Sequence, residues 1–167
     1  MKDTTPTQNP TVTAAPFGAD PTRRLVIVGC SAEKRTTGQP QPALDLYDGG
    51  CVPPLRARLG DAPARRARIR ILSAQHGLVT ADTPLAWYDR PLDAPRAAEL
   101  RSAVRHRLVA EFDVDGTPEE ILIIAEPLYL VPLADLLALP ARPPIHWIPD
   151  HADGWPHAAT ILDRWGW

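Results

Sequence analysis

The sequence predicts an α/β protein built on a mainly parallel central sheet. Apolar runs of strand length alternate along the chain with segments whose apolar residues recur at helical spacing, and this alternation is typical of parallel strands joined by crossover helices. A chain of 167 residues can bury a core without disulfides or metals. We therefore expect one domain over residues 22–167. Residues 1–21 are rich in Thr, Pro, Asn and Ala without an apolar period, which predicts a disordered tail.

Four segments are predicted as strands. The first covers residues 24–29, whose continuous Leu-Val-Ile-Val run suits a strand covered on both faces. The others lie, in chain order, at residues 67–75, at residues 119–127 and near residue 147. Helices are predicted at residues 53–59, 94–112, 128–139 and 157–165.

The composition indicates a cytoplasmic protein without a membrane partner. No apolar run approaches the roughly 18 residues that a membrane-spanning helix needs, and the polar beginning of the chain lacks a signal-peptide core. Without an export signal, Cys30 and Cys51 are expected to remain free thiols. No cofactor is predicted.

Arginine is concentrated in the middle of the chain. Residues 51–110 carry eleven Arg against five acidic residues, whereas residues 111–167 carry two Arg against ten acidic residues. The stretch from Arg56 to Arg70 therefore has two interpretations: it binds phosphates of a nucleic acid, or it forms a solvated helix face.

The first strand ends in a reactive cluster. Cys30 and Ser31 follow the apolar run directly, and Lys34 comes three residues after Ser31. Ser31 is expected to cap a helical turn whose free amides, with Lys34, bind a phosphate or carboxylate. The alternative is a buried thiol, a capping hydroxyl and a surface cation. Neither the P-loop spacing nor the dinucleotide-binding glycine fingerprint is present.

The second strand runs into Ser73, followed by His76 and Gly77. Gly77 suits a positive φ angle, which projects His76 from the strand end. The imidazole is then placed for proton transfer or for a hydrogen bond to a nucleobase edge, although a lone histidine is most often structural.

Two further segments carry chemistry. Trp87, Tyr88 and Asp89 lie between prolines, where the rings can stack on a base and the carboxylate can bind ribose or polarise water; the alternative is an aromatic plug over the core. The third strand ends at Glu126, close to Tyr129. Glu126 is either a nucleophile or general base, or a cap for the following helix.

The C-terminal segment is rich in His, Asp and Trp. The sequence Asp-His-Ala-Asp-Gly-Trp-Pro-His starts at Asp150, but its spacing matches no standard zinc or calcium site, so a solvated turn and no metal are predicted. Trp155, Trp165 and Trp167 are expected to pack on the body of the protein or on a second subunit in a homo-oligomer.

Several motifs together resemble a known family. The chain contains Cys-Ser-Ala-Glu-Lys, then Leu-Tyr, then Leu-Ser-Ala-Gln-His-Gly-Leu, then Tyr-Asp. It resembles, over about residues 25–130, an uncharacterised family of small bacterial and phage proteins, some labelled as peroxide-stress proteins. That family is distantly similar to the uracil-DNA-glycosylase-like domain of archaeosine synthase.

The resemblance implies a Rossmann-like three-layer sandwich with a pocket for a nucleobase, nucleoside or nucleotide. It carries over to ten positions, which are Cys30, Ser31, Lys34, Tyr47, Ser73, His76, Gly77, Tyr88, Asp89 and Tyr129. In the family pattern glycines commonly follow the third strand, whereas this chain has Ala125-Glu126-Pro127.

The leading hypothesis is an enzyme that acts at or near the N-glycosidic bond of a nucleotide-like substrate, as a hydrolase or base-exchange transferase. Ser31 and Lys34 would hold phosphate, Trp87 or Tyr88 would stack on the base, and His76 would protonate or orient it. Asp89 or Glu126 would activate water, or Cys30 would be a covalent nucleophile. The alternatives are a nucleic-acid-binding module that uses residues 56–70 and a noncatalytic nucleotide sensor.

Overall fold

The computed structural model describes Asp20 and residues 23–167. At its centre lies a five-stranded sheet of order β4-β3-β1-β6-β7, which confirms the predicted α/β class with a mainly parallel sheet. These strands are β1 (Arg24–Gly29), β3 (Ile69–Ser73), β4 (Gly77–Thr80), β6 (Glu120–Ile124) and β7 (Ile145–Ile148). Apart from Asp20, the predicted tail over residues 1–21 lies outside the described residues.

The sheet has a point where the direction of strand addition reverses. The central strand β1 pairs in parallel with both β3 and β6, β6 pairs in parallel with β7, and β4 returns antiparallel to β3. The chain thus adds β3 on one side of β1 and later adds β6 on the other. In open parallel sheets, ligands bind outside the carboxyl ends of the strands at such a switch point. A ligand site is therefore expected at the boundary between β1 and β6.

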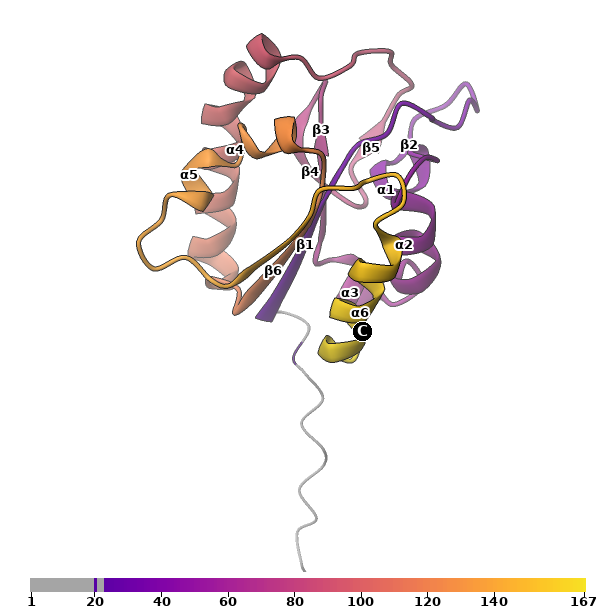
Figure 1. Ribbon diagram of the computed structural model, residues 1–167. Helices are drawn as coiled ribbons and strands as arrows, with labels where there is room; N and C mark the ends of the chain where they lie inside the picture. Colours follow the sequence, from indigo (N-terminus) through magenta and orange to yellow (C-terminus); the bar gives the residue numbers. More distant parts are fainter. Residues whose placement is uncertain (1–19, 21–22) are drawn as a thin grey trace, which may run out of the picture.

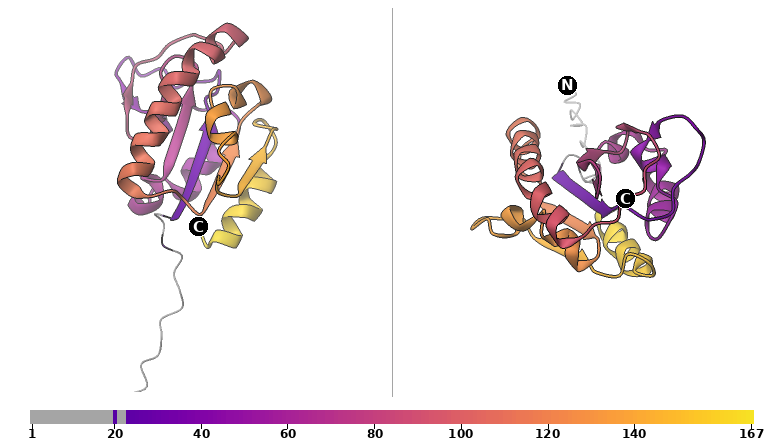
Figure 2. Two further views of the ribbon diagram at one scale, coloured as in Figure 1. Left: turned by 90° about the vertical axis from the view of Figure 1, so that its left-hand side faces the viewer. Right: turned by 90° about the horizontal axis from the view of Figure 1, so that it is seen from above.

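Helices cover both faces of the sheet (Figure 1). One face packs against α1 (Ala43–Leu46), α2 (Val52–Leu59) and α6 (Trp155–Trp165), and the other against α4 (Ala94–Asp115) and α5 (Ala134–Leu137). Figure 2 shows the same division when the molecule is seen from above. The short helix α3 (Pro63–Arg66) precedes β3, and a two-stranded ribbon joins β2 (Gln41–Pro42) to β5 (Pro84–Leu85).

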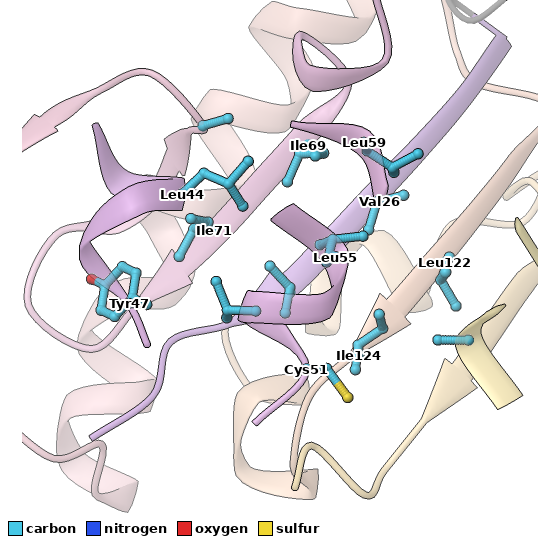
Figure 3. Close-up of a cluster of buried hydrophobic side chains, with 14 of the residues drawn as sticks. Val26, Leu44, Tyr47, Cys51, Leu55, Leu59, Ile69, Ile71, Leu122 and Ile124 are labelled. Atoms are coloured by element: carbon cyan, nitrogen blue, oxygen red, sulfur yellow. The ribbon is translucent and has the colours of Figure 1, made fainter. Parts of the chain in front are cut away.

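The central strand fills both halves of the core because its side chains alternate between the two faces. Val26 and Val28 belong to the cluster under α1, α2 and α6, whereas Leu25 and Ile27 belong to the cluster under α4 and α5. This explains why residues 25–28 are all apolar and buried. Figure 3 shows the first cluster, in which Tyr47 packs among aliphatic side chains.

The prediction of one helix over residues 128–139 is wrong. The segment forms a 3₁₀ turn, η2 (Pro127–Leu130), and then the separate helix α5. Pro132 lies between them, and a proline has no amide to continue a helical hydrogen-bond ladder. The antiparallel strand β4 was not among the predicted elements, because its four residues offer too short a pattern.

The C-terminal tryptophans belong to this chain's own core. Trp165 and Trp167 are buried at 2% and 5% exposure, and Trp155 packs against the same cluster. This confirms their predicted packing on the body of the protein, and it leaves Trp165 and Trp167 without a surface for a second subunit. Among the described residues, no helix combines the length and the apolar character needed to span a bilayer.

Candidate functional site

A cavity of about 390 Å³ opens at the carboxyl edge of the sheet, at the switch point between β1 and β6. Its walls come from segments that follow β1, β6 and β7, and from the segment before α4. Six of the predicted site residues line it, and they are Cys30, Ser31, Lys34, Asp89, Glu126 and Tyr129. The strand ends thus bring together groups that lie up to 99 residues apart in the chain.

The structure contradicts the helical turn predicted after the first strand. Residues 30–33 form an irregular segment, so Ser31 caps no helix and no row of helical amides faces the cavity. The Ser31 hydroxyl instead donates to the Glu33 carbonyl at 2.8 Å and accepts from the Gly49 amide at 3.1 Å. It therefore fixes the loop between β1 and α1 and is not free to hold a phosphate.

All three tyrosines of the chain gather behind or within the cavity wall. The hydroxyls of Tyr47 and Tyr88 lie 2.6 Å apart, and the Tyr88 hydroxyl lies 2.8 Å from Ser73 Oγ. The Tyr129 hydroxyl lies 3.1 Å from Cys30 Sγ. Tyr47 and Ser73 are fully buried, and Tyr88, which binds both, does not line the cavity either. These three predicted ligand-binding residues therefore support the wall from behind.

The three phenols remain protonated at neutral pH. Burial raises the pKa of Tyr47 to about 12, and it also raises the pKa values of Tyr88 and Tyr129, with the nearby Cys30 adding to each effect. Since Tyr129 keeps its proton, its hydroxyl can donate to the Cys30 sulfur. The Ala74 amide donates to the same sulfur at 3.4 Å.

Lys34 is held over aromatic rings at the cavity rim. Its Nζ lies 4.4 Å from the Tyr88 ring centroid and 5.6 Å from that of Tyr47, distances at which a cation is attracted to the ring face. Its backbone forms a bridge with Tyr47. The two tyrosine rings thus hold the Lys34 ammonium group in place, next to the segment that carries Tyr88 and Asp89.

Three further predicted site residues do not line the cavity either. His76 is exposed, and its ring lies edge-on to that of Tyr88, with the ring centroids 5.4 Å apart. The partial burial of the imidazole lowers its pKa, and the nearby Arg96 lowers it further. Gly77 has the predicted positive φ, at +73°, but it faces Leu100 and Val104 under α4. Trp87 is 56% exposed.

The cavity also contains groups that the sequence did not single out. Glu33 and Arg90 line it, and so does His151, which is buried and hydrogen-bonded to the Gly29 carbonyl. The sequence placed His151 in a solvated turn. Its position after β7, the last strand on that side of the sheet, is the signal that could have identified it.

The charges around the cavity nearly balance. The cations Lys34 and Arg90 face the three carboxylates of Glu33, Asp89 and Glu126. Such a wall does not favour a highly anionic ligand. Within the described part of the chain, no three His, Cys, Asp or Glu side chains are grouped so that they could hold a metal ion.

The arginines of residues 56–70 are committed to the fold. Each of them donates to a carboxylate or to a backbone carbonyl of this chain, and they are Arg56, Arg58, Arg65, Arg66, Arg68 and Arg70. Arg70, for example, is 5% exposed and binds Glu111. These contacts give each of the six arginines a structural partner within the chain.

A family model matches residues 25–143. The chain belongs to a family of unknown function, DUF6884. The DUF6884 segment contains every predicted site residue from Cys30 to Tyr129 and ends before β7, so His151 lies beyond it. No curated protein and no solved structure shows a significant match to the chain.

Proposed function

We propose that this protein is an enzyme acting at or near the N-glycosidic bond of a nucleoside or nucleotide, as a hydrolase or base-exchange transferase. One observation carries the proposal: Asp89 and Glu126, from separate segments, line the same cavity at the switch point of the sheet. Carboxylates that flank a glycosidic carbon can activate water and stabilise an oxocarbenium-like centre. The cavity volume, about 390 Å³, lies in the range of small-molecule sites.

The surroundings support the remaining roles. Tyr129 lines the cavity and its ring can stack on a base, whereas the exposed Trp87 lies outside the wall. Lys34 and Arg90 supply positive charge at the rim. The resemblance of the Cys-Ser-x-x-Lys element to the glycosylase-like domain of archaeosine synthase, and the Rossmann-like three-layer sandwich that it implies, favour the same reaction class.

The structure favours the carboxylates over Cys30 as the reactive groups. The helix N-terminus that would have activated the thiol is not formed, because the segment after β1 is irregular. The near balance of charge around the cavity favours a nucleoside or nucleoside monophosphate over a polyphosphate.

The test is release of free base. The full chain is incubated with ribonucleosides and their 5′-mono- and triphosphates between pH 5 and pH 9, and the products are separated by chromatography. Base release is expected, and either Asp89→Asn or Glu126→Gln should lower the rate by about 10²–10⁴-fold. The exposed Asp113→Asn is the matched control and should leave the rate unchanged.

Absence of base release from every compound, with and without a second base as acceptor, would contradict the proposal. Release that neither carboxylate variant reduces would contradict the assigned roles. A noncatalytic sensor would bind a nucleoside and leave it intact.

A further inference from the structure

One hydrogen bond fixes the tautomer of the His151 ring. It follows β7, is 8% exposed, and places its Nε2 2.8 Å from the Gly29 carbonyl oxygen. A carbonyl oxygen only accepts hydrogen bonds, so Nε2 must carry a hydrogen. In the neutral ring the proton is therefore on Nε2, and Nδ1 carries an unshared lone pair.

The lone pair on Nδ1 has no partner within the described residues. The ring lies so close against Gly50 that a Cβ at position 50 would collide with Nδ1. Gly50 also has a φ of +59°, a conformation that glycine adopts readily. A larger residue would displace the imidazole, so the glycine leaves room for this ring against the wall.

Nδ1 is not fully enclosed by the protein. Among the described residues, the side-chain nitrogens that are both fully enclosed and unpaired belong to Arg24 and Trp167, so Nδ1 of His151 is not sealed. Both His151 and Gly50 line the cavity. An acceptor atom without a partner thus belongs to a residue of the cavity wall.

The imidazole is suited to remain an acceptor at neutral pH. Burial lowers the pKa of His151, against the opposing effects of the Gly29 hydrogen bond and of three carboxylates. Those carboxylates are Glu126 and Glu33 on the cavity wall and Asp150 next in the chain. A carboxylate only accepts hydrogen bonds, so none of the three can supply the donor that Nδ1 lacks.

We propose that Nδ1 of His151 accepts a hydrogen bond from an N–H or O–H group of the nucleoside in the cavity, which makes His151 a specificity-determining contact. This inference rests on the proposed function, because it takes the nucleoside as the ligand. It predicts that removing the donor from the ligand, or the acceptor from the protein, weakens binding by the same factor.

Two substitutions separate the two ring nitrogens. In His151→Gln the side-chain amide can reach the place of Nε2 and keep the bond to Gly29, but the acceptor at Nδ1 is lost. In His151→Asn the amide oxygen lies close to the place of Nδ1, and the bond to Gly29 is lost. The Gln variant should bind uridine and inosine about tenfold more weakly, and the Asn variant should bind within about threefold of wild type.

If His151 had only a structural role through its bond to Gly29, the Asn variant would bind nucleosides more weakly than the Gln variant. A Gln variant that binds like wild type would therefore overturn the inference. Analogues identify the donor: the 2′-deoxy compounds lack one sugar hydroxyl, and ring-N-methyl compounds lack the base N–H. The analogue that lacks the hydrogen-bonding group should bind wild type about tenfold more weakly than the parent nucleoside does. The His151→Gln variant should bind that analogue and the parent nucleoside equally well.

Nitrogen NMR on the unaltered chain provides a test that needs no variant. The imidazole of His151 should show the Nε2–H form at pH 7, and its Nδ1 resonance should move when uridine or inosine is added. If the amides of Cys30 and Asp89 respond but Nδ1 does not, the inference fails while the proposed function stands. If no cavity amide responds to any nucleoside, the proposed function fails and the inference with it.

Discussion

The hydroxyl oxygens of Tyr47 and Tyr88 lie 2.6 Å apart, and this contact ties the loop before α4 to the core. Tyr47 follows α1 and is fully buried, and Ser73, the other partner of Tyr88, ends β3. Asp89 comes next in the chain after Tyr88. The carboxylate proposed to act on the substrate is therefore positioned by a side chain anchored at two elements of the fold.

Removing the Tyr88 hydroxyl should destabilise the protein. Tyr88→Phe removes one hydrogen bond from each of the buried hydroxyls of Tyr47 and Ser73, and the loss of two such bonds costs about 1–3 kcal/mol. Urea unfolding followed by circular dichroism measures the change in the free energy of unfolding. Trp87→Phe, at the neighbouring exposed position, should change it by less than about 0.5 kcal/mol. A Tyr88→Phe variant as stable as wild type would show that the contact does not anchor the loop.

Long apolar segments made most of the sheet and the main helices predictable. Residues 24–29 form β1 as predicted, since a continuous apolar run has few alternatives inside a sheet. The elements that were not predicted, α1 and α3 among them, have four residues each. Such elements are decided by packing and by turns, and no periodic pattern can build up over one helical turn.

The candidate site was predictable where residues directly follow a strand. Cys30, Glu126 and Tyr129 reach the cavity because the carboxyl ends of parallel strands share one edge. The predicted capping role of Ser31 was wrong, because the loop geometry depends on Gly49, 18 residues away. His151 was overlooked because its burial depends on a contact with Gly29, which local sequence does not reveal.

Two arginines that bind the same carboxylate should differ strongly in their effect on stability. Arg70 and Arg107 both donate to Glu111, but the Arg70 side chain is 6% exposed and that of Arg107 is 47% exposed. Arg70→Ala removes the buried partner and should lower the free energy of unfolding by about 3–5 kcal/mol. Arg107→Ala should cost less than about 1 kcal/mol.

Denaturant titrations of both variants, compared with wild type, give these values. If Arg70→Ala lowered the free energy of unfolding as little as Arg107→Ala, Arg70 would not be structural. An arginine of residues 56–70 would then be free to bind a phosphate.

Stability should fall in acid through Glu120. Its carboxylate accepts from Trp165 Nε1 at 3.1 Å and Arg24 at 3.3 Å, and it lies 2.8 Å from His146 Nε2. Burial acts to raise the pKa of Glu120, but these hydrogen bonds and charges outweigh it and lower the pKa below its usual 4.5. The unfolded state therefore binds the proton first, so stability present above about pH 4.5 is lost as the pH falls further.

The measurement is the free energy of unfolding from pH 7 to pH 3 for wild type and Glu120→Gln. The variant should be less stable by about 1.5–3 kcal/mol at pH 7, and the difference should shrink toward pH 3. The adjacent Glu119→Gln is the control, because Glu119 pairs with Arg23 at the surface and should matter little. A constant difference across the pH range would contradict the assigned role of the carboxylate.

The two thiols should react at very different rates. Cys51 is fully buried, and burial, with a smaller effect from Asp150, raises its pKa to about 11. At pH 8 only about a thousandth of such a thiol is ionised, and the thiolate is the reactive form. Cys30 is partly exposed and lines the cavity. Iodoacetamide should therefore label one cysteine in the native protein and two in urea, as counted by mass spectrometry.

Single cysteine variants show which thiol iodoacetamide labels in the native protein. Cys30→Ser should lose native labelling, and Cys51→Ala should keep it. Equal native labelling of both positions would contradict the burial of Cys51. Because Cys30 is part of the cavity wall, a nucleoside that occupies the cavity should slow its alkylation in the Cys51→Ala protein. The same thiol then reports occupancy of the site independently of any reaction, which separates a protein that binds nucleosides from one that also cleaves them.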